Sequence, residues 1–197
     1  MWQRLSIDVV AGSGYNGGGT MTSGDEEHPA EATKGLSRRQ SRRKAFELLF
    51  ELNYRPDLNA ETILRRTFED LDVQDLHLID EDNDGYVAGR LDAGACLFIK
   101  ELVHAVKDHE SELDHELARY PHDWSYDRIG VAERVLLQLA LAEMVYLGTS
   151  YKVVINETLD MAKLYAQEEA RRFINGILGA AVRNLEEIRA RAGGGDE

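Results

Sequence analysis

The residue types best suited to holding a ligand are five cations packed into seven consecutive positions: Arg38, Arg39, Arg42, Arg43 and Lys44. They stand in the stretch "LSRRQSRRKAF", while the whole chain of 197 residues carries a formal net charge of -13. Arginine presents planar donors that suit phosphate groups and that stack on nucleobases. The chemistry that this spacing offers is the binding of an anion, and of nucleic acid in particular.

The stability of the helix itself does not explain the cluster. Ser37 and Gln40 have the spacing of a capping box, which predicts that a helix begins here. A helix N-terminus carries a partial positive charge, so each cation in the first turn costs about 0.3–1 kcal/mol at low salt. Solvated surface is the alternative interpretation. Because an acidic body repels polyanions, any nucleic-acid site must be local.

Other groups that could do chemistry give weaker signals. The stretch "DEDNDG", residues 80–85, matches the first half of an EF-hand calcium loop, but the twelfth position is Leu91 instead of a bidentate acid, so an acidic loop is favoured. Cys96 is the only cysteine and stands among apolar residues at helical spacing, which predicts a core position. The sequence therefore predicts no catalytic residue, no metal and no cofactor, and thus no enzyme.

Apolar residues recur with a helical period through most of the chain. Residues 131–147 are apolar almost all round, which predicts a central buried helix. Sustained strand-like alternation is missing from the sequence, so we predict an all-α protein of about seven helices in one compact bundle with two halves. The predicted helices span about 37–55, 61–71, 92–108, 109–120, 131–147, 153–166 and 168–192.

The two ends of the chain have a different composition. Residues 1–36 are rich in Gly, Ser, Thr and acidic residues without an apolar period, which predicts a disordered extension. Met21 within it is an alternative start of the chain. Residues 193–197 are predicted to be a flexible tail. No apolar run approaches the roughly 20 residues of a membrane span, and a cytoplasmic location is predicted.

The C-terminal third contains features that packing alone does not require. Asn156 and Glu157 are predicted at a helix start, where Asn caps and Glu suits the helix dipole. Gly176 stands inside a helical pattern, where glycine costs about 1 kcal/mol relative to alanine, and this indicates close approach of a second helix. Tyr165 and Phe173 flank a short connection and arginines. Core packing is their default role, and base stacking is the alternative.

Three segments together resemble one protein family. The segment "YKVVINETLDMAKLYAQEEARRFINGIL", residues 151–178, resembles the signature of the NusB family of bacterial transcription antitermination factors. Two further segments, "SRRQSRRKAFELLFELNY" and "VAERVLLQLALAEMVYL", resemble two other helices of that family. The likeness covers about residues 37–188. It implies two packed helical bundles, so that residues 37–192 would form a NusB-like helical RNA-binding domain.

The resemblance also implies a role and a set of contacts. NusB proteins bind boxA, a short U-rich single-stranded RNA element of ribosomal RNA leaders, together with the small-subunit ribosomal protein NusE, in the antitermination complex of RNA polymerase. Some members form homodimers. The implied RNA contacts are Arg38, Arg39, Arg42, Tyr165, Glu169 and Phe173, and the implied NusE contacts are Phe50, Tyr54 and Glu133. We call Arg38, Arg39 and Arg42 the basic arm. Arg43 and Lys44 depart from the family pattern, add two positive charges to this arm, and are assigned to the RNA contacts as well.

The sequence is also compatible with two other functions. NusB-like domains also occur fused to rRNA cytosine methyltransferases, so the alternative is a related RNA-binding domain that acts in rRNA maturation. We expect no methyl-donor domain after residue 190, however, and Cys96 lacks the preceding proline of that catalytic motif. The third hypothesis is a calcium-responsive helical module that uses the acidic loop at residues 80–85.

Overall fold

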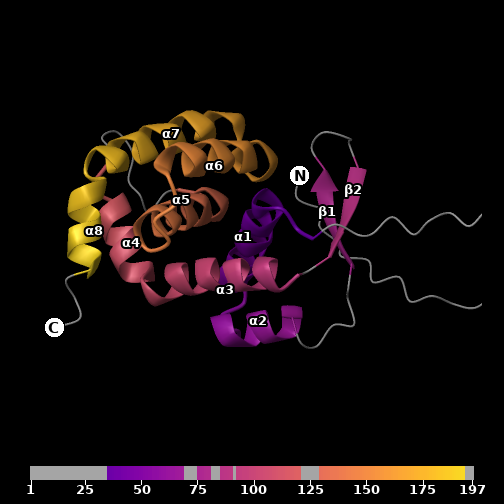
Figure 1. Cartoon of the computed structure of the whole chain (residues 1–197). Coiled ribbons are helices and arrows are strands. Elements are labelled where there is room, and N and C mark those ends of the chain that lie inside the picture. The colour runs from indigo at the N-terminus through magenta and orange to yellow at the C-terminus, as the bar shows by residue number, and fades with distance from the viewer. Residues whose placement is uncertain (1–34, 69–74, 81–84, 91, 121–128, 194–197) are drawn as a thin grey trace, which may run out of the picture. The chain divides into compact units, whose positions relative to one another are not determined.

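The computed structural model describes residues 35–68, 75–80, 85–90, 92–120 and 129–193. These residues form eight helices and one two-stranded antiparallel hairpin (Figure 1). The helices are α1 Arg38–Tyr54, α2 Ala60–Phe68, α3 Ala93–Asp108, α4 Glu110–Leu117, α5 Val131–Val145, α6 Tyr151–Tyr165, α7 Glu168–Arg183 and α8 Leu185–Gly193. The strands are β1 Asp75–Asp80 and β2 Gly85–Arg90.

The predicted all-α class is confirmed, with two differences in detail. The last predicted helix, over 168–192, is broken at Asn184, whose φ of -110° and ψ of 11° separate α7 from α8. The hairpin is the second difference: Asp75 pairs with Arg90, and Asp80 pairs with Gly85. Of the acidic loop considered for calcium, residues 81–84 lie outside the described residues.

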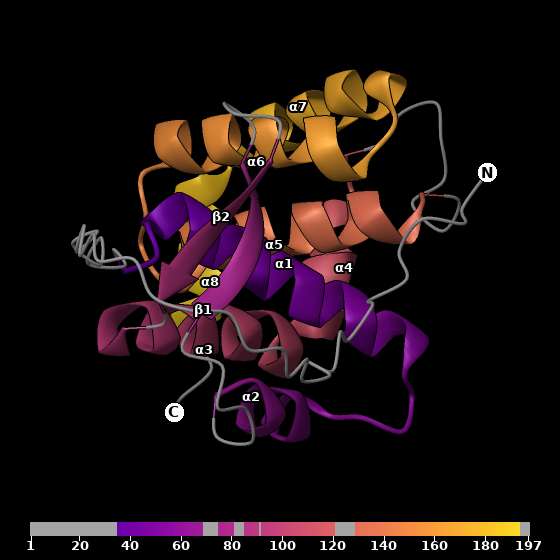
Figure 2. The same ribbon diagram turned by 90° about the vertical axis from the view of Figure 1, so that its right-hand side faces the viewer.

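Helix α5 forms the centre of the hydrophobic core. Every residue from 135 to 144 is buried, as the all-round apolar pattern predicts. Helices α1, α3, α4, α6, α7 and α8 all pack against α5. Both views place α1 between α3 and α6 (Figures 1 and 2). The core helix therefore fixes the positions of the helices that carry the predicted contacts.

The start of α1 agrees with its sequence signal. Ser37 Oγ accepts a hydrogen bond from the Gln40 backbone N–H at 3.2 Å, and Gln40 Oε1 accepts one from the Ser37 N–H at 2.8 Å. The predicted cap of α6 is wrong. Helix α6 begins at Tyr151 after Ser150, which places Asn156 and Glu157 inside the helix.

The predicted packing role of Gly176 is also wrong. A Cβ atom built at Gly176 would meet no atom within 4 Å, and the residue is exposed in the interior of α7. We therefore expect Gly176→Ala to raise the free energy of unfolding by about 0.5–1 kcal/mol, because alanine is the better helix former. Chemical denaturation measures this change.

The matched control is Gly148, between α5 and α6. It also has open space around a Cβ atom, but its φ is +67°. An L-residue in that region costs roughly 1–2 kcal/mol, so Gly148→Ala should destabilise the protein. Destabilisation by Gly176→Ala would show that the exposed face of α7 requires glycine for a reason outside helix propensity.

Candidate nucleic-acid interface

The cations of α1 divide between two sides of the helix. The guanidinium carbons of Arg38 and Arg42 lie 4.1 and 5.5 Å from the centre of the Phe98 ring, on α3. Arg39 instead donates hydrogen bonds to Glu157 and Asp160 of α6. Residues four apart share a side of an α-helix, and a single step rotates the chain by about 100°. Arg38 and Arg42 therefore lie on the side of α1 next to Phe98, and Arg39 lies on the side next to α6.

Arg42 is an internal residue of the bundle. Its Nε and Nη2 donate to the Glu143 carboxylate at 2.8 and 2.7 Å, and the two residues are only 6% and 1% exposed. Glu157 Oε2 lies 4.0 Å from Arg42 Nη1. This ion pair ties α1 to the central helix α5. The structure thus gives Arg42 a structural role, and its contact with RNA stays a prediction.

Arg39 makes a more exposed contact with α6. Its Nε lies 3.2 Å from Glu157 Oε2, and Nη2 bonds the Asp160 carboxylate, with 37% of the Arg39 side chain exposed. Lys163 Nζ also donates to Asp160, at 2.5 Å. The hydrogen bond from Lys163 lowers the pKa of Asp160, and the Arg39 and Arg171 charges act in the same direction. Asp160 is therefore an anion at neutral pH, as its contact with Arg39 requires.

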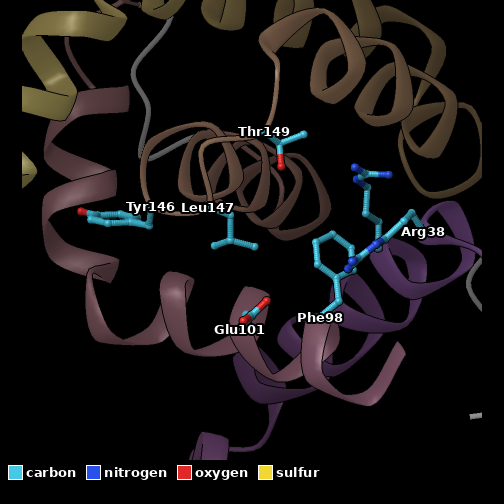
Figure 3. A pocket seen from close by; sticks show the side chains of 7 residues that line it. Arg38, Phe98, Glu101, Tyr146, Leu147 and Thr149 are labelled. Carbon is cyan, nitrogen blue, oxygen red and sulfur yellow. The ribbon is translucent and has the colours of Figure 1, made fainter. Parts of the chain in front are cut away.

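Arg38 lies beside a hollow in the surface. The hollow has a volume of about 720 Å³ and is lined by Arg38, Arg42, Phe98, Glu101, Tyr146, Leu147 and Thr149. Arg38 and Phe98 lie at one end of it and Tyr146 at the other (Figure 3). Arg38 is exposed, and within the described part of the chain it makes no ion pair. Its charge is thus available to an anion that reaches the start of α1.

A row of aromatic rings begins at Tyr165, the last residue of α6, and continues along α1 from the predicted RNA side to the predicted NusE side. The Tyr165 ring lies 4.4 Å from Phe46, Phe46 lies 5.7 Å from Phe50, and Phe50 lies 5.1 Å from Tyr54, measured between ring centres. The Tyr165 hydroxyl donates to Glu47 at 3.3 Å. Within α1, exposure rises from 2% at Phe46, through the half-buried Phe50, to 62% at Tyr54. We call these four rings, Tyr165, Phe46, Phe50 and Tyr54, the aromatic row.

The other predicted residues are placed as follows. Arg43 is buried at 4%, and Lys44 is half-buried with its Nζ 3.3 Å from Glu47. Glu169 is exposed in the first turn of α7, and Phe173 is half-buried against the core. Glu133 is half-buried in the first turn of α5.

Three residues that contact the arginines of α1 were not predicted from the sequence. Phe98, Glu143 and Asp160 were not singled out, because each meets α1 only in the folded state. Among the described residues, no group of three His, Cys, Asp or Glu side chains could hold a metal ion. Of the helices described, none is long and apolar enough to cross a membrane.

Comparison with known proteins decides the family. A family model described as the NusB family matches residues 39–183. The chain belongs to the NusB family. The matched region runs from α1 to the end of α7 and so includes the aromatic row, the Arg42–Glu143 pair and the Arg39 contacts with α6.

Curated relatives carry the same family name. The transcription antitermination protein NusB of Desulfovibrio desulfuricans is 36% identical over 154 residues, which cover 78% of this chain and 88% of that protein. The NusB of Ligilactobacillus salivarius is 31% identical over 144 residues, which cover 73% of this chain and 95% of that protein. The two alignments thus cover most of this chain and nearly all of each relative.

Solved structures agree with the fold. NusB of T. maritima superposes with a TM-score of 0.59 at 27% identity, covering 79% of this chain and 92% of that one. A chain from a crystal structure of the antitermination factors NusB and NusE in complex with dsRNA gives a TM-score of 0.58 at 26% identity, covering 74% and 96%. This chain is therefore similar to a protein whose structure contains both NusE and RNA.

Proposed function

We propose that this NusB-family chain binds boxA-type, U-rich single-stranded RNA of ribosomal RNA leaders together with NusE, and acts in the antitermination complex of RNA polymerase. The observation that carries the proposal is the aromatic row of α6 and α1, which joins the predicted RNA residue Tyr165 to the predicted NusE residues Phe50 and Tyr54. The two proposed contact surfaces then adjoin each other through rings of α6 and α1.

The proposed roles follow from exposure and charge. Arg38 and Arg39, at the exposed start of α1, would take RNA phosphates. Tyr165 and Phe173, on either side of the turn between α6 and α7, would stack on bases, which is worth about 1–3 kcal/mol per base. Tyr54, with 62% of its surface exposed, would contact NusE. The similarity to a chain from a crystal structure of NusB and NusE in complex with dsRNA supports NusE and RNA as the two partners.

The test is a binding titration with three RNA probes of equal length. They are a U-rich single strand of boxA type, a scrambled single strand and a duplex, each measured with and without NusE. Single-stranded RNA exposes its bases for stacking, whereas a duplex does not. We expect the U-rich strand to bind tightest and NusE to increase its affinity. Equal or tighter binding of the duplex would contradict the proposal.

Replacing both exposed arginines should weaken RNA binding. We expect Arg38→Ala with Arg39→Ala to reduce the affinity for the U-rich strand about thirtyfold, since each of the two lost charged hydrogen bonds costs roughly 1 kcal/mol after solvation. Two fewer phosphate contacts should also flatten the slope of log K against log salt by about 1.4. Titrations at several salt concentrations measure both values.

The matched control removes two arginines elsewhere. Arg65→Ala with Arg66→Ala makes the same change in net charge on α2, where Arg66 pairs with Glu51. This control should leave the RNA affinity and the salt slope close to those of the wild type. An equal loss in both double variants would mean that net charge alone governs binding.

A further inference from the structure

We propose that Glu157 and Asp160 compete with RNA phosphate for Arg39, and thereby hold the RNA affinity of this chain below the level that its basic arm can supply. The inference rests on the proposed function, which makes Arg39 a phosphate contact. Glu157 and Asp160, both on α6, would thereby set the affinity of the chain for RNA.

The contact occupies the same donors that a phosphate would use. Arg39 Nε lies 3.2 Å from Glu157, and Nη2 bonds Asp160. Carboxylate and phosphate oxygens both suit the planar fork of a guanidinium. A phosphate that reaches Arg39 must therefore replace at least one carboxylate, and it meets negative charge if both remain in place.

The Arg39 contact is exposed enough to exchange. The side chains of Arg39, Glu157 and Asp160 are 37%, 22% and 28% exposed. By contrast, the Arg42 and Glu143 side chains are 8% and 1% exposed. Partly exposed ion pairs are worth at most about 1 kcal/mol, and buried pairs resist separation. RNA can thus displace the carboxylates from Arg39, but not Glu143 from Arg42.

Glu157 and Asp160 each keep a nearby cation after Arg39 has moved from them to a phosphate. Asp160 retains the hydrogen bond from Lys163 Nζ at 2.5 Å. Glu157 Oε2 remains 4.0 Å from Arg42 Nη1. Neither anion is left without a nearby positive charge, so releasing Arg39 costs little. The arrangement is therefore suited to a reversible exchange of ligands on Arg39.

The test compares carboxamide variants of the full-length chain. Glu157→Gln and Asp160→Asn keep the size of the side chain and remove its charge. With the U-rich single strand as probe, we expect the double variant to bind about threefold to tenfold more tightly than the wild type, as expected for two exposed ion pairs. We expect the gain to vanish when Arg39→Ala is added, because the cycle isolates the interaction with Arg39.

Two controls separate this effect from general electrostatics. Glu51→Gln removes one carboxylate charge from α1, where it pairs with Arg66, and should change the affinity little. The Arg39→Ala background is the second control. Asp160→Asn also frees Lys163 from its hydrogen bond, and any gain in RNA affinity due to Lys163 would persist in that background. Thermal unfolding of each variant verifies that it is folded at the titration temperature.

The outcomes distinguish the inference from the function on which it rests. An Arg39-dependent gain supports the inference. Wild-type binding with no gain in the carboxamide variants overturns the inference alone, as does a gain that persists in the Arg39→Ala background or is matched by Glu51→Gln. Absence of RNA binding by the wild type and by every variant overturns the proposed function, and the inference with it.

Discussion

Arg42→Ala lowers the free energy of unfolding by about 3–5 kcal/mol in our account, because it leaves a buried charge without a partner. Glu143 is 1% exposed and accepts hydrogen bonds from Arg42 Nε and Nη2 at 2.8 and 2.7 Å. Removal of the guanidinium leaves that carboxylate, which belongs to the core helix α5, inside the bundle without its partner. Urea denaturation followed by far-ultraviolet circular dichroism measures the loss.

Arg39→Ala is the matched control, since it removes the same side chain from the same helix. Its ion pairs are partly exposed, so the expected loss of stability is below about 1 kcal/mol. A second variant, Arg42→Met with Glu143→Leu, removes both charges and should recover much of the stability lost by Arg42→Ala. Equal effects of Arg42→Ala and Arg39→Ala would contradict the structural role of Arg42.

The burial of Arg42 makes it a poor position for testing RNA binding by the basic arm. The sequence resemblance assigns Arg42 to RNA, and the structure places it in a buried pair with Glu143. Loss of RNA binding by an Arg42 variant would combine partial unfolding with any lost contact. The exposed pair of Arg38 and Arg39 is therefore the better probe of the RNA arm.

Tyr54→Ala should weaken binding of NusE about thirtyfold or more, which corresponds to the loss of roughly 2 kcal/mol at an aromatic hot spot. The Tyr54 side chain is 62% exposed and ends the aromatic row, with its ring 5.1 Å from Phe50. A large exposed ring held by a neighbouring ring is well suited to filling a pocket on a partner. Isothermal titration of NusE into the full-length chain measures the change.

Tyr151→Ala provides the comparison for Tyr54. Tyr151 is also an exposed tyrosine, at 40%, but it is the first residue of α6 and does not belong to the aromatic row. Its replacement should change NusE affinity by less than about twofold. If both variants bound NusE as the wild type does, the predicted NusE surface would be wrong.

Much of the helical architecture follows from local sequence patterns. The capping box at Ser37 and Gln40 locates the start of α1, and the apolar segment at 131–147 predicts the buried α5. These signals depend on neighbours within one or two turns of the chain. Local rules fail at Gly176, where the helical position was recognised but the inferred close contact does not exist. The hairpin was missed because two six-residue strands are too short for a sustained alternation.

The ion pairs of the arm could not be predicted from local patterns. Arg42 and Glu143 are 101 positions apart, and Arg39 and Glu157 are 118 apart. The helix dipole disfavours cations at the start of α1, and considered alone this indicates an external anion. The fold instead brings carboxylates from α5 and α6 to Arg42 and Arg39. Part of the basic cluster therefore stabilises the bundle, and Arg38 and Arg39 remain the exposed cations best placed for RNA.

Photocrosslinking locates the bound RNA on the surface of the protein. A U-rich single strand that carries photoreactive uridines is bound to the full-length chain with NusE, irradiated, and the crosslinked residues are identified by mass spectrometry. We expect crosslinks at Tyr165 and Phe173, with α2 and α8 unlabelled. Crosslinks confined to α2 or α8 would contradict this prediction, because RNA would then bind away from the start of α1 and the turn between α6 and α7.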